Sequence, residues 1–336
     1  MIVSGVDIKE NLIRNLDEEL LKILLKDRTT QNNIIWATDS YIENGPSYYP
    51  KAEMTVKSVT GYKGNIIRPR ANKSKKDQNI RIKKKAEVFT PSWVCNAQNN
   101  LVDNAWFERE SVFNFETDKG WVVNAEKIVF SDVKGKTWED YVLANRLEIS
   151  CGEAPYLVSR YDTVSGEWLD VNNRIGILDR KIRVVNENVT DDVLWFEWVK
   201  KAFQSSYGYE WQGDSLLIAR ENLLFTFVDY YQDRFGKEPS LKMLMEIAYI
   251  VSWNIWQMDG IKYVVPMSCD NEEFQISIDN LLSDDESKCG CIGCKTGDHS
   301  KHNGIYAKIK DWRKKESFTF FSMLPETPSN NKRGNK

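Results

Sequence analysis

The fold is indicated most directly by one stretch, RLEISCGEAPYLVSRYD, which covers residues 146–162. A short apolar run reaches Glu148, then Cys151-Gly152 and turn-forming residues follow, and a second apolar segment comes after them. This order predicts a strand, a tight loop and the start of a helix. Glycine lets a backbone approach closely, and the unpaired N–H groups of a helix start can hold an anionic or nucleotide-like ligand. An ordinary strand–turn–helix unit without a ligand is the alternative.

Two further apolar runs predict strands that end in an acid. RIGILD, at 174–179, predicts a strand next to the first one, ending in Asp179. An acid at the end of the second strand commonly accepts the ribose hydroxyls of a nucleotide-like ligand. The full Gly-x-Gly-x-x-Gly motif is missing, so the sequence does not support dinucleotide binding. NNIIWATDSY predicts a strand that ends at Asp39.

Helical periodicity accounts for much of the remaining chain. Apolar residues recur at helical spacing over 8–26, and Thr90-Pro91 predicts the start of another helix. Strong helical signals run from 190 onward, with one helix over about 215–235 and another over about 240–252. The tryptophans of this block fall at helical spacing, which predicts core packing. Strands that alternate with helices indicate an α/β core with an additional helical block.

The charge of the chain is uneven although its formal net value is only −3. The stretch 68–85 holds nine basic residues and one acid, which suits contact with phosphates. A solvated linker is the alternative for this stretch. The predicted DNA contacts are Arg68, Arg70, Lys73, Lys75, Lys76, Arg81, Lys83, Lys84 and Lys85.

The cysteines and histidines predict a metal site near the C-terminus. No apolar run is long enough to span a bilayer and the N-terminus lacks the features of a signal peptide, which predicts a cytoplasmic protein with reduced thiols. Thiolates and imidazoles clustered in CGCIGCKTGDHSKH suit tetrahedral Zn²⁺, held by three cysteines and either His299 or His302. Such a shell leaves no open position, so the zinc would be structural; a flexible loop with idle thiols is the alternative. The candidate ligands are Cys289, Cys291, Cys294, His299 and His302.

Several of these segments resemble adenine-specific DNA methyltransferases, in that family's order. KKAEVFTPSWVCN at 84–96 resembles the Gly-Glu-x-Phe-Thr-Pro segment that opens their catalytic region, and EISCGEAPYL resembles their Asp-Pro-x-Cys-Gly-x-Gly-x-Phe-Leu loop. RIGILDRKI and NIWQMDGIK resemble their second and third strands, and the whole chain resembles the short bacterial proteins called restriction endonuclease subunit M. The resemblance implies a class I S-adenosylmethionine-dependent methyltransferase-like, Rossmann-like sheet. It also implies that the cofactor contacts Phe89, Thr90, Pro91, Glu148, Cys151, Gly152, Asp179 and Asp259.

The sequence departs from that family at two places. Ala154 stands where the family has its second loop glycine, and the catalytic tetrapeptide, Asn or Asp followed by Pro-Pro-Tyr, is missing. That tetrapeptide accepts the protons of the adenine amine and stacks an aromatic ring on the flipped base. Some DNA methyltransferases carry their segments in permuted order, so we consider Asp39 as the acceptor and Tyr41 as the stacking residue. A strand end followed by a turn is the alternative.

These segments predict five regions: an N-terminal helix and strand region at 1–67, the basic segment at 68–85, a methyltransferase-like core with a helical insertion at 86–265, a Cys/His metal-binding element at 266–324 and a disordered tail at 325–336. The expected function is methylation of DNA, at adenine N6, within a restriction–modification type of system. DNA and a restriction or specificity subunit are the expected partners. The alternatives are a non-catalytic methyltransferase-like subunit that binds DNA or assembles with other proteins, and a zinc-stabilised nucleic-acid-binding protein without a cofactor.

Overall fold

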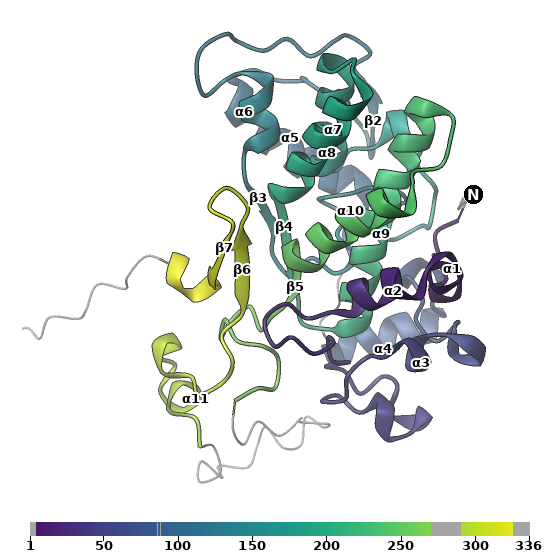
Figure 1. Ribbon diagram of the computed structural model, residues 1–336, viewed down its shortest axis with the longest axis vertical. Helices are drawn as coiled ribbons and strands as arrows, with labels where there is room; N and C mark the ends of the chain where they lie inside the picture. Colours follow the sequence, from purple (N-terminus) through teal and green to yellow (C-terminus); the bar gives the residue numbers. More distant parts are fainter. Residues whose placement is uncertain (1–4, 86, 88, 270–289, 325–336) are drawn as a thin grey trace, which may run out of the picture.

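A small parallel sheet lies at the centre of the molecule (Figure 1). The structure is a computed structural model that describes residues 5–85, 87, 89–269 and 290–324. The strands of the sheet, in their spatial order, are β3 (Arg146–Glu148), β4 (Ser206–Glu210) and β5 (Ile255–Gln257). All three run in the same direction, so their carboxyl ends meet at one edge of the sheet.

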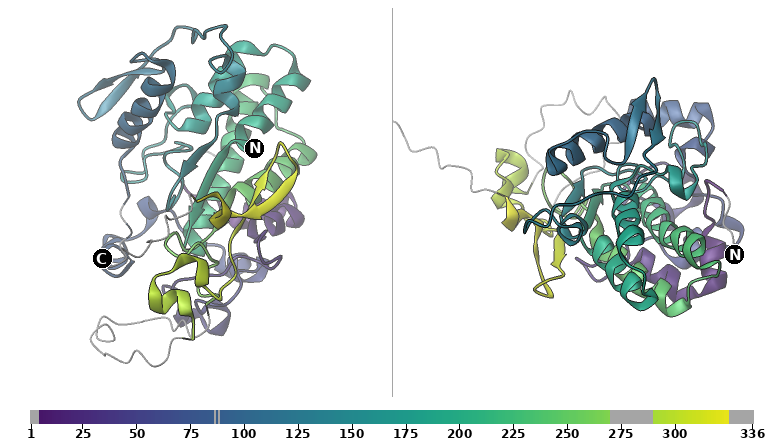
Figure 2. Two further views of the ribbon diagram at one scale, coloured as in Figure 1. Left: turned by 90° about the vertical axis from the view of Figure 1, so that its left-hand side faces the viewer. Right: turned by 90° about the horizontal axis from the view of Figure 1, so that it is seen from above.

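Two pairs of helices connect the strands and cover one face of the sheet (Figures 1 and 2). They are α7 (Ile177–Asn188) and α8 (Asp192–Gln204) before β4, and α9 (Gly213–Phe235) and α10 (Leu241–Asn254) before β5. Helix α9 is buried on nearly every side and ends at Gly236, whose φ of +63° suits a residue without a Cβ. Ser240 starts α10 because its side chain accepts a hydrogen bond from the backbone N–H of Met243. The predicted helices over 215–235 and 240–252 are confirmed.

The N-terminal region packs beside these helices. Its elements are α1 (Glu10–Leu16), α2 (Glu18–Leu25), α3 (Val56–Val59) and α4 (Lys75–Lys85). The single helix predicted over 8–26 is divided at Asp17, which has an extended backbone and caps α2 by accepting from the N–H of Glu19. The strand predicted to end at Asp39 is wrong, since this stretch forms only isolated bridges, such as Ile35 with Glu53, and Asp39 lies in a bend.

The strand predicted at 174–179 is also wrong. Gly176 precedes α7, so Asp179 lies in the first turn of a helix. The carboxylate of Asp179 accepts hydrogen bonds from the N–H groups of Ser159 and Gly176, which holds this helix start against the segment after β3. The strand next to β3 is instead β4, which follows α8.

The remaining helices and strands complete the fold. They are α5 (Ser92–Phe107), β1 (Asn114–Thr117), β2 (Gly120–Val123), α6 (Trp138–Leu143), α11 (Ile292–Thr296), β6 (Lys308–Asp311) and β7 (Glu316–Thr319). Strands β1 and β2 form one antiparallel hairpin and β6 and β7 another. The protein is thus a mixed α/β protein with one three-stranded parallel sheet and a C-terminal element beside it. Among the described residues no helix is both long and apolar enough to cross a membrane.

Candidate cofactor cavity and metal centre

A cavity of about 510 Å³ lies at the carboxyl ends of β3 and β4. This is where ligands bind in open α/β sheets, and the volume is in the range of small-molecule sites. Two segments that are far apart in the sequence face each other across it, the one with Phe89 and Thr90 and the loop that follows β3. Its lining includes Ala37, Glu87, Phe89, Thr90, Glu148, Cys151, Gly152, Glu210 and Gln212.

The loop after β3 is shaped by left-handed backbone conformations. Gly152 has a φ of +55°, and its N–H donates to the carboxylate of Glu210 over 2.9 Å. A Cβ at this position would meet only the ring of Phe89, at 3.8 Å, so the ring lies next to the glycine and no other atom crowds it. Ala154 has a φ of +63°, which shows that the loop keeps a glycine-like backbone at the position where the methyltransferases have their second glycine.

Two buried carboxyl groups form one wall of the cavity. Burial raises the pKa of Glu148 to about 8, although the N–H groups of Tyr156 and Leu157 donate to it and oppose the increase. Burial also raises the pKa of Glu210, which accepts from three backbone N–H groups at the end of β4. Without a bound cation, both groups therefore favour the protonated form more than exposed carboxyls do.

A third carboxylate, Glu87, lines the cavity and is part of a buried ion cluster. Arg81 pairs with both Glu87 and Asp214, and the ammonium of Lys73 lies 3.9 Å and 3.8 Å from the same two carboxylates. Burial alone would raise the pKa of Asp214, but Arg81 and Lys73 lower it to about 2. Arg81 and Lys73 therefore face inward, which corrects the prediction that they contact DNA phosphates.

The rest of the basic segment is more accessible. The backbone N–H of Arg70 donates to Glu153, and its guanidinium lies 5.2 Å from the centre of the Phe89 ring. The side chains of Lys84 and Lys85 lie outside the described residues. Four of the predicted phosphate contacts are exposed on or beside α4: Arg68, Lys75, Lys76 and Lys83.

Three predicted cofactor contacts lie outside the lining of the cavity. Asp179 is buried in α7, so the prediction that it ends a strand beside Gly152 is wrong. Asp259 follows β5 and accepts from the N–H groups of Ile261 and Lys262, and Pro91 precedes α5. The acid at the end of the neighbouring strand is Glu210. The sequence contains a signal for it, because SYGYE at 206–210 is a short aromatic run that ends in an acid before a turn and a long helix.

The segment with Asp39 and Tyr41 borders the cavity only through Ala37. Tyr41 is 7% exposed, its hydroxyl donates to Asp214 over 2.7 Å, and its ring lies 4.8 Å from that of Trp36. Burial raises the pKa of Tyr41 well above its ordinary value. This ring is enclosed by protein and cannot receive a flipped base, which corrects the stacking role predicted for Tyr41.

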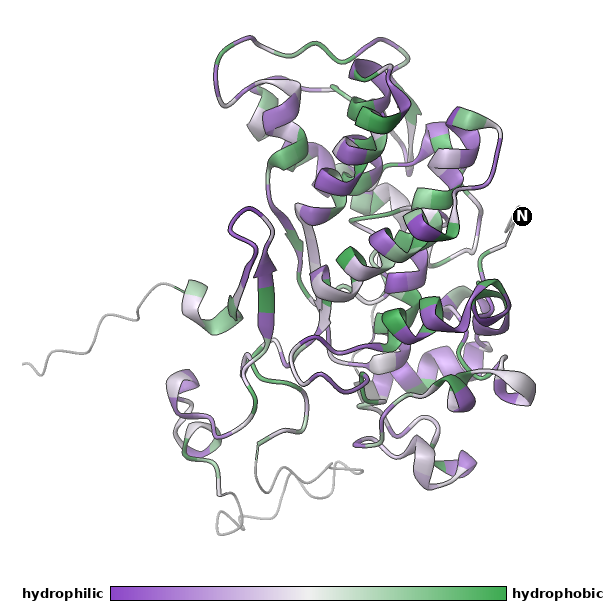
Figure 3. Cartoon of the chain, in the orientation of Figure 1, coloured by the Kyte–Doolittle hydropathy of each residue, from purple (hydrophilic) through white to green (hydrophobic). Residues whose placement is uncertain are grey.

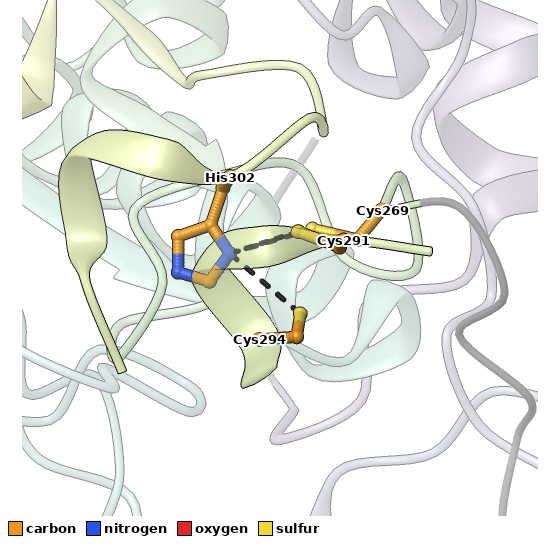
Figure 4. Close-up of side chains that lie close together, drawn as sticks. All are labelled: Cys269, Cys291, Cys294 and His302. Atoms are coloured by element: carbon orange, nitrogen blue, oxygen red, sulfur yellow. Dashed lines mark hydrogen bonds between the residues drawn. The ribbon is translucent and has the colours of Figure 1, made fainter. Parts of the chain in front are cut away.

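A second candidate site is a cluster of four metal-binding side chains near the C-terminus (Figure 4). The Nδ1 atom of His302 lies 3.7, 3.5 and 3.6 Å from the sulfur atoms of the three cysteines. A tetrahedral zinc ion with ordinary bond lengths separates a sulfur ligand from a nitrogen ligand by about 3.6 Å. One imidazole nitrogen cannot bond three thiols at once, so an ion at the centre explains the arrangement better than hydrogen bonds do. The four residues are Cys269, Cys291, Cys294 and His302.

Two glycines allow the cluster to close. A Cβ at Gly293 would lie 2.7 Å from Nδ1 of His302, and a Cβ at Gly304 would lie 3.0 Å from the sulfur of Cys269. The N–H of Asn303 donates to the sulfur of Cys291 over 3.4 Å. Burial acts to raise the pKa of Cys291, but this and other hydrogen bonds outweigh it and lower the pKa to about 6. The thiolate, which is the form that binds metal, is thereby favoured.

The cluster agrees in part with the predicted ligands. Cys291, Cys294 and His302 come together as expected, and of the two histidines it is His302, rather than His299, that joins them. Cys289 lies outside the described residues. Cys269 was missed because it lies 22 residues before Cys291 in the sequence. In the folded protein the segment 258–269 brings it to the site. No signal in the sequence points to Cys269, because three cysteines at 289–294 and one histidine already complete a four-ligand shell.

Comparisons of the chain with known protein families, with curated proteins and with solved structures find no match. Each site therefore has to be understood from its own donors, charges and shape. The cavity offers carboxylates and an aromatic ring at the ends of parallel strands, and the cluster offers three sulfurs and one nitrogen.

Proposed function

We propose that the protein binds S-adenosylmethionine in the cavity at the ends of β3 and β4 and methylates a DNA base, adenine N6. The observation that carries the proposal is that Phe89 and Thr90 lie across one cavity from Glu148, Cys151 and Gly152. The resemblance to adenine-specific DNA methyltransferases places cofactor contacts in the same two segments. Five of the eight cofactor contacts expected from that resemblance line this cavity.

The charge of the cavity suits this cofactor better than a phosphorylated one. Glu87, Glu148 and Glu210 all line it, and carboxylates accept hydrogen bonds from ribose hydroxyls and attract positive groups. S-adenosylmethionine carries a sulfonium and an ammonium against a single carboxylate. The phosphates of a dinucleotide or of ATP would instead face three carboxyl groups. Glu210, at the end of the strand next to β3, is the best placed to receive the ribose.

The residues of the chain would orient the cofactor rather than react with it. The bound cofactor supplies an electrophilic methyl group. Glu148 and Glu210 would hold its polar groups, Phe89 would pack against its apolar part, and the loop at Gly152 leaves room for close approach. The exposed cations of α4, beside the segment that leads to Glu87, would contact DNA phosphates.

A second candidate function is a non-catalytic subunit that keeps the cofactor cavity. Two observations favour it: the chain has no Asn or Asp followed by Pro-Pro-Tyr, and Tyr41, the proposed substitute, is buried against Asp214. Such a subunit would bind S-adenosylmethionine and DNA within an assembly and leave the chemistry to another chain.

For the metal centre we propose Zn²⁺. Three thiolates and one imidazole at tetrahedral spacing are typical of structural zinc sites, and a complete shell leaves no position for substrate. The ion would join the segment that ends at Cys269 to the segment from Cys291 to His302. It would thereby hold the β6–β7 hairpin beside β5, where Ile309 and Phe320 pack with Trp256.

Calorimetric titration with S-adenosylmethionine tests the cavity, and transfer of a labelled methyl group to DNA tests the activity. Phe89→Ala and Glu210→Gln are expected to weaken binding about tenfold or more, while Glu126→Gln, at an exposed site, leaves it unchanged. Binding with transfer supports the enzyme, and binding without transfer supports the non-catalytic subunit. If neither the cofactor nor its demethylated product binds, both functions are wrong.

A further inference from the structure

A groove of about 680 Å³ lies between the central sheet and the β6–β7 hairpin. Its residues come from the start of β3 and β4, from the end of α8 and from the hairpin, and it shares no lining residue with the cofactor cavity. Figure 2 shows the hairpin and α11 on the side of the sheet away from the helices. The groove therefore needs an explanation of its own.

The groove is an incompletely covered part of a sheet face. Parallel sheets are normally covered on both faces, because their strands are apolar on both sides. Here the hairpin packs on Tyr209 and Trp256, but it leaves Leu147 of β3 45% exposed and Met323 57% exposed. Strand β3 is also the edge of the sheet within the described residues. An apolar floor next to an open strand edge is typical of a surface that another polypeptide covers.

Positive charge surrounds this apolar floor. Arg146, Lys201 and Arg313 line the groove, and none of the three forms a salt bridge with any residue that the structure describes. Asp311 is the one acid in the lining. Figure 3 shows a hydrophobic band in β6 and a hydrophilic tip of the hairpin. The complementary ligand is therefore both apolar and acidic.

The aromatic rings of the groove favour a polypeptide over a single-stranded nucleic acid. Bases bind such grooves by stacking on free aromatic faces. The ammonium of Lys310 lies 4.6 Å from the centre of the Trp312 ring, and the Trp256 ring packs on Phe320 at 5.5 Å and is 2% exposed. The Trp312 and Trp256 rings are therefore each covered on at least one face, whereas the apolar floor with Phe318 and the edge of β3 are open to an extended chain.

We propose that this groove is the docking site for an acidic, amphipathic segment of a partner protein. Large apolar side chains of the segment pack on Leu147 and Phe318, and its carboxylates pair with Arg146, Lys201 and Arg313 at the rim. The site does not depend on the methyl donor. It gives the protein a way to join an assembly whether or not it transfers a methyl group itself.

Selection of dodecapeptides from a random phage-displayed library against the full-length, zinc-loaded protein tests this proposal. The library is depleted on the Leu147→Asp variant, which removes peptides that bind elsewhere. The selected peptides are expected to be net acidic with two or more large apolar residues. Fluorescence anisotropy of a labelled selected peptide should show at least a tenfold loss of affinity for Lys201→Glu and for Arg313→Glu. Lys57→Glu, a charge reversal at an exposed position on α3, should leave the affinity unchanged.

Two outcomes would overturn the proposal. Peptides that are enriched in basic residues, or that bind the charge-reversal variants as well as the unaltered protein, would show that the groove does not select acidic segments. A labelled oligothymidylate that competes with the peptides and binds more tightly would instead assign the groove to single-stranded DNA. Circular dichroism and zinc content of each variant confirm that the substitutions leave the protein folded and metal-loaded.

Discussion

Replacing Glu148 with glutamine tests whether a buried carboxyl group at the end of β3 keeps its proton when the cavity holds no ligand. Glu148 is 8% exposed, and burial raises its pKa from 4.5 to about 8. At about 1.4 kcal/mol for each factor of ten, ionising this group in the folded protein costs about 5 kcal/mol more than in the unfolded chain. Glutamine has a similar shape but no proton to lose in this range.

The sign of the effect on stability follows from the direction of the pKa change. The folded state keeps a proton that the unfolded state releases above pH 4.5, so the stabilising contribution is complete below that pH and declines as the pH rises to about 8. Between pH 6 and pH 8.5 the contribution should fall by about 2.5 kcal/mol in the unaltered protein. In Glu148→Gln this part of the pH dependence should be absent.

Urea unfolding at several pH values measures this difference, with Glu126→Gln as an exposed control. Curves of unfolding free energy against pH that stay parallel for the unaltered protein and Glu148→Gln would refute the reasoning, because they would show that Glu148 is already ionised.

The protonation of Glu148 should also change when the proposed cofactor binds. A cationic ligand favours the ionised form, so titrations in two buffers at pH 7 should show that the unaltered protein releases nearly one proton more than Glu148→Gln does.

Three other perturbations have definite expected results. Gly293→Ala places a methyl group against His302 and should weaken zinc binding about tenfold or more in competition with a chromogenic chelator, whereas Ile292→Ala, which is exposed, should not. Arg81→Met removes the closer cation of buried Asp214, at 2.8 Å, and leaves Lys73 at 3.8 Å, and it should lower the unfolding free energy by about 3–5 kcal/mol in urea. Removing the metal with a chelator should increase hydrogen exchange in the β6–β7 hairpin and leave α9 protected; equal protection of the hairpin with and without metal would contradict the structural role.

The sequence predicted those parts of the fold that depend on local signals. The long helices α9 and α10 have helical periodicity, and their predicted bounds lie within two residues of the observed ones. The loop at Gly152 was identified from a strand, a glycine and a turn, which are also local, but the helix start predicted directly after it is wrong, since the next α-helix is α7. The metal site was predicted from the cluster of cysteines and histidines between 289 and 302. In each case neighbouring residues carry the information.

The errors have a common physical cause, which is contact between residues far apart in the sequence. RIGILD is apolar enough for a strand, and periodicity alone cannot separate a short buried strand from a buried helix start. Its helical form depends on Ser159, whose N–H donates to Asp179. Arg81 lies in a basic segment, which predicts a surface cation, but its side chain points inward and pairs with Asp214. Cys269 likewise has no other cysteine or histidine near it in the sequence that would indicate a metal ligand.

The strongest physical reason to expect a positively charged ligand in the cavity is the free-energy cost of burying its carboxyl groups. Burying carboxyl groups without cations disfavours folding or forces them to take up protons, and the raised pKa values of Glu148 and Glu210 show that effect. Some buried acids are neutralised directly, as Asp103 is by Arg180 and Asp214 by Arg81, whereas burial raises the pKa of Glu10 and of Glu221 as it does for the two cavity acids. What distinguishes Glu148 and Glu210 from Glu10 and Glu221 is that they line the cavity at the ends of β3 and β4. Perturbed acids that line a cavity are typical of functional sites, and a sulfonium or ammonium group of a bound cofactor would supply the missing charge.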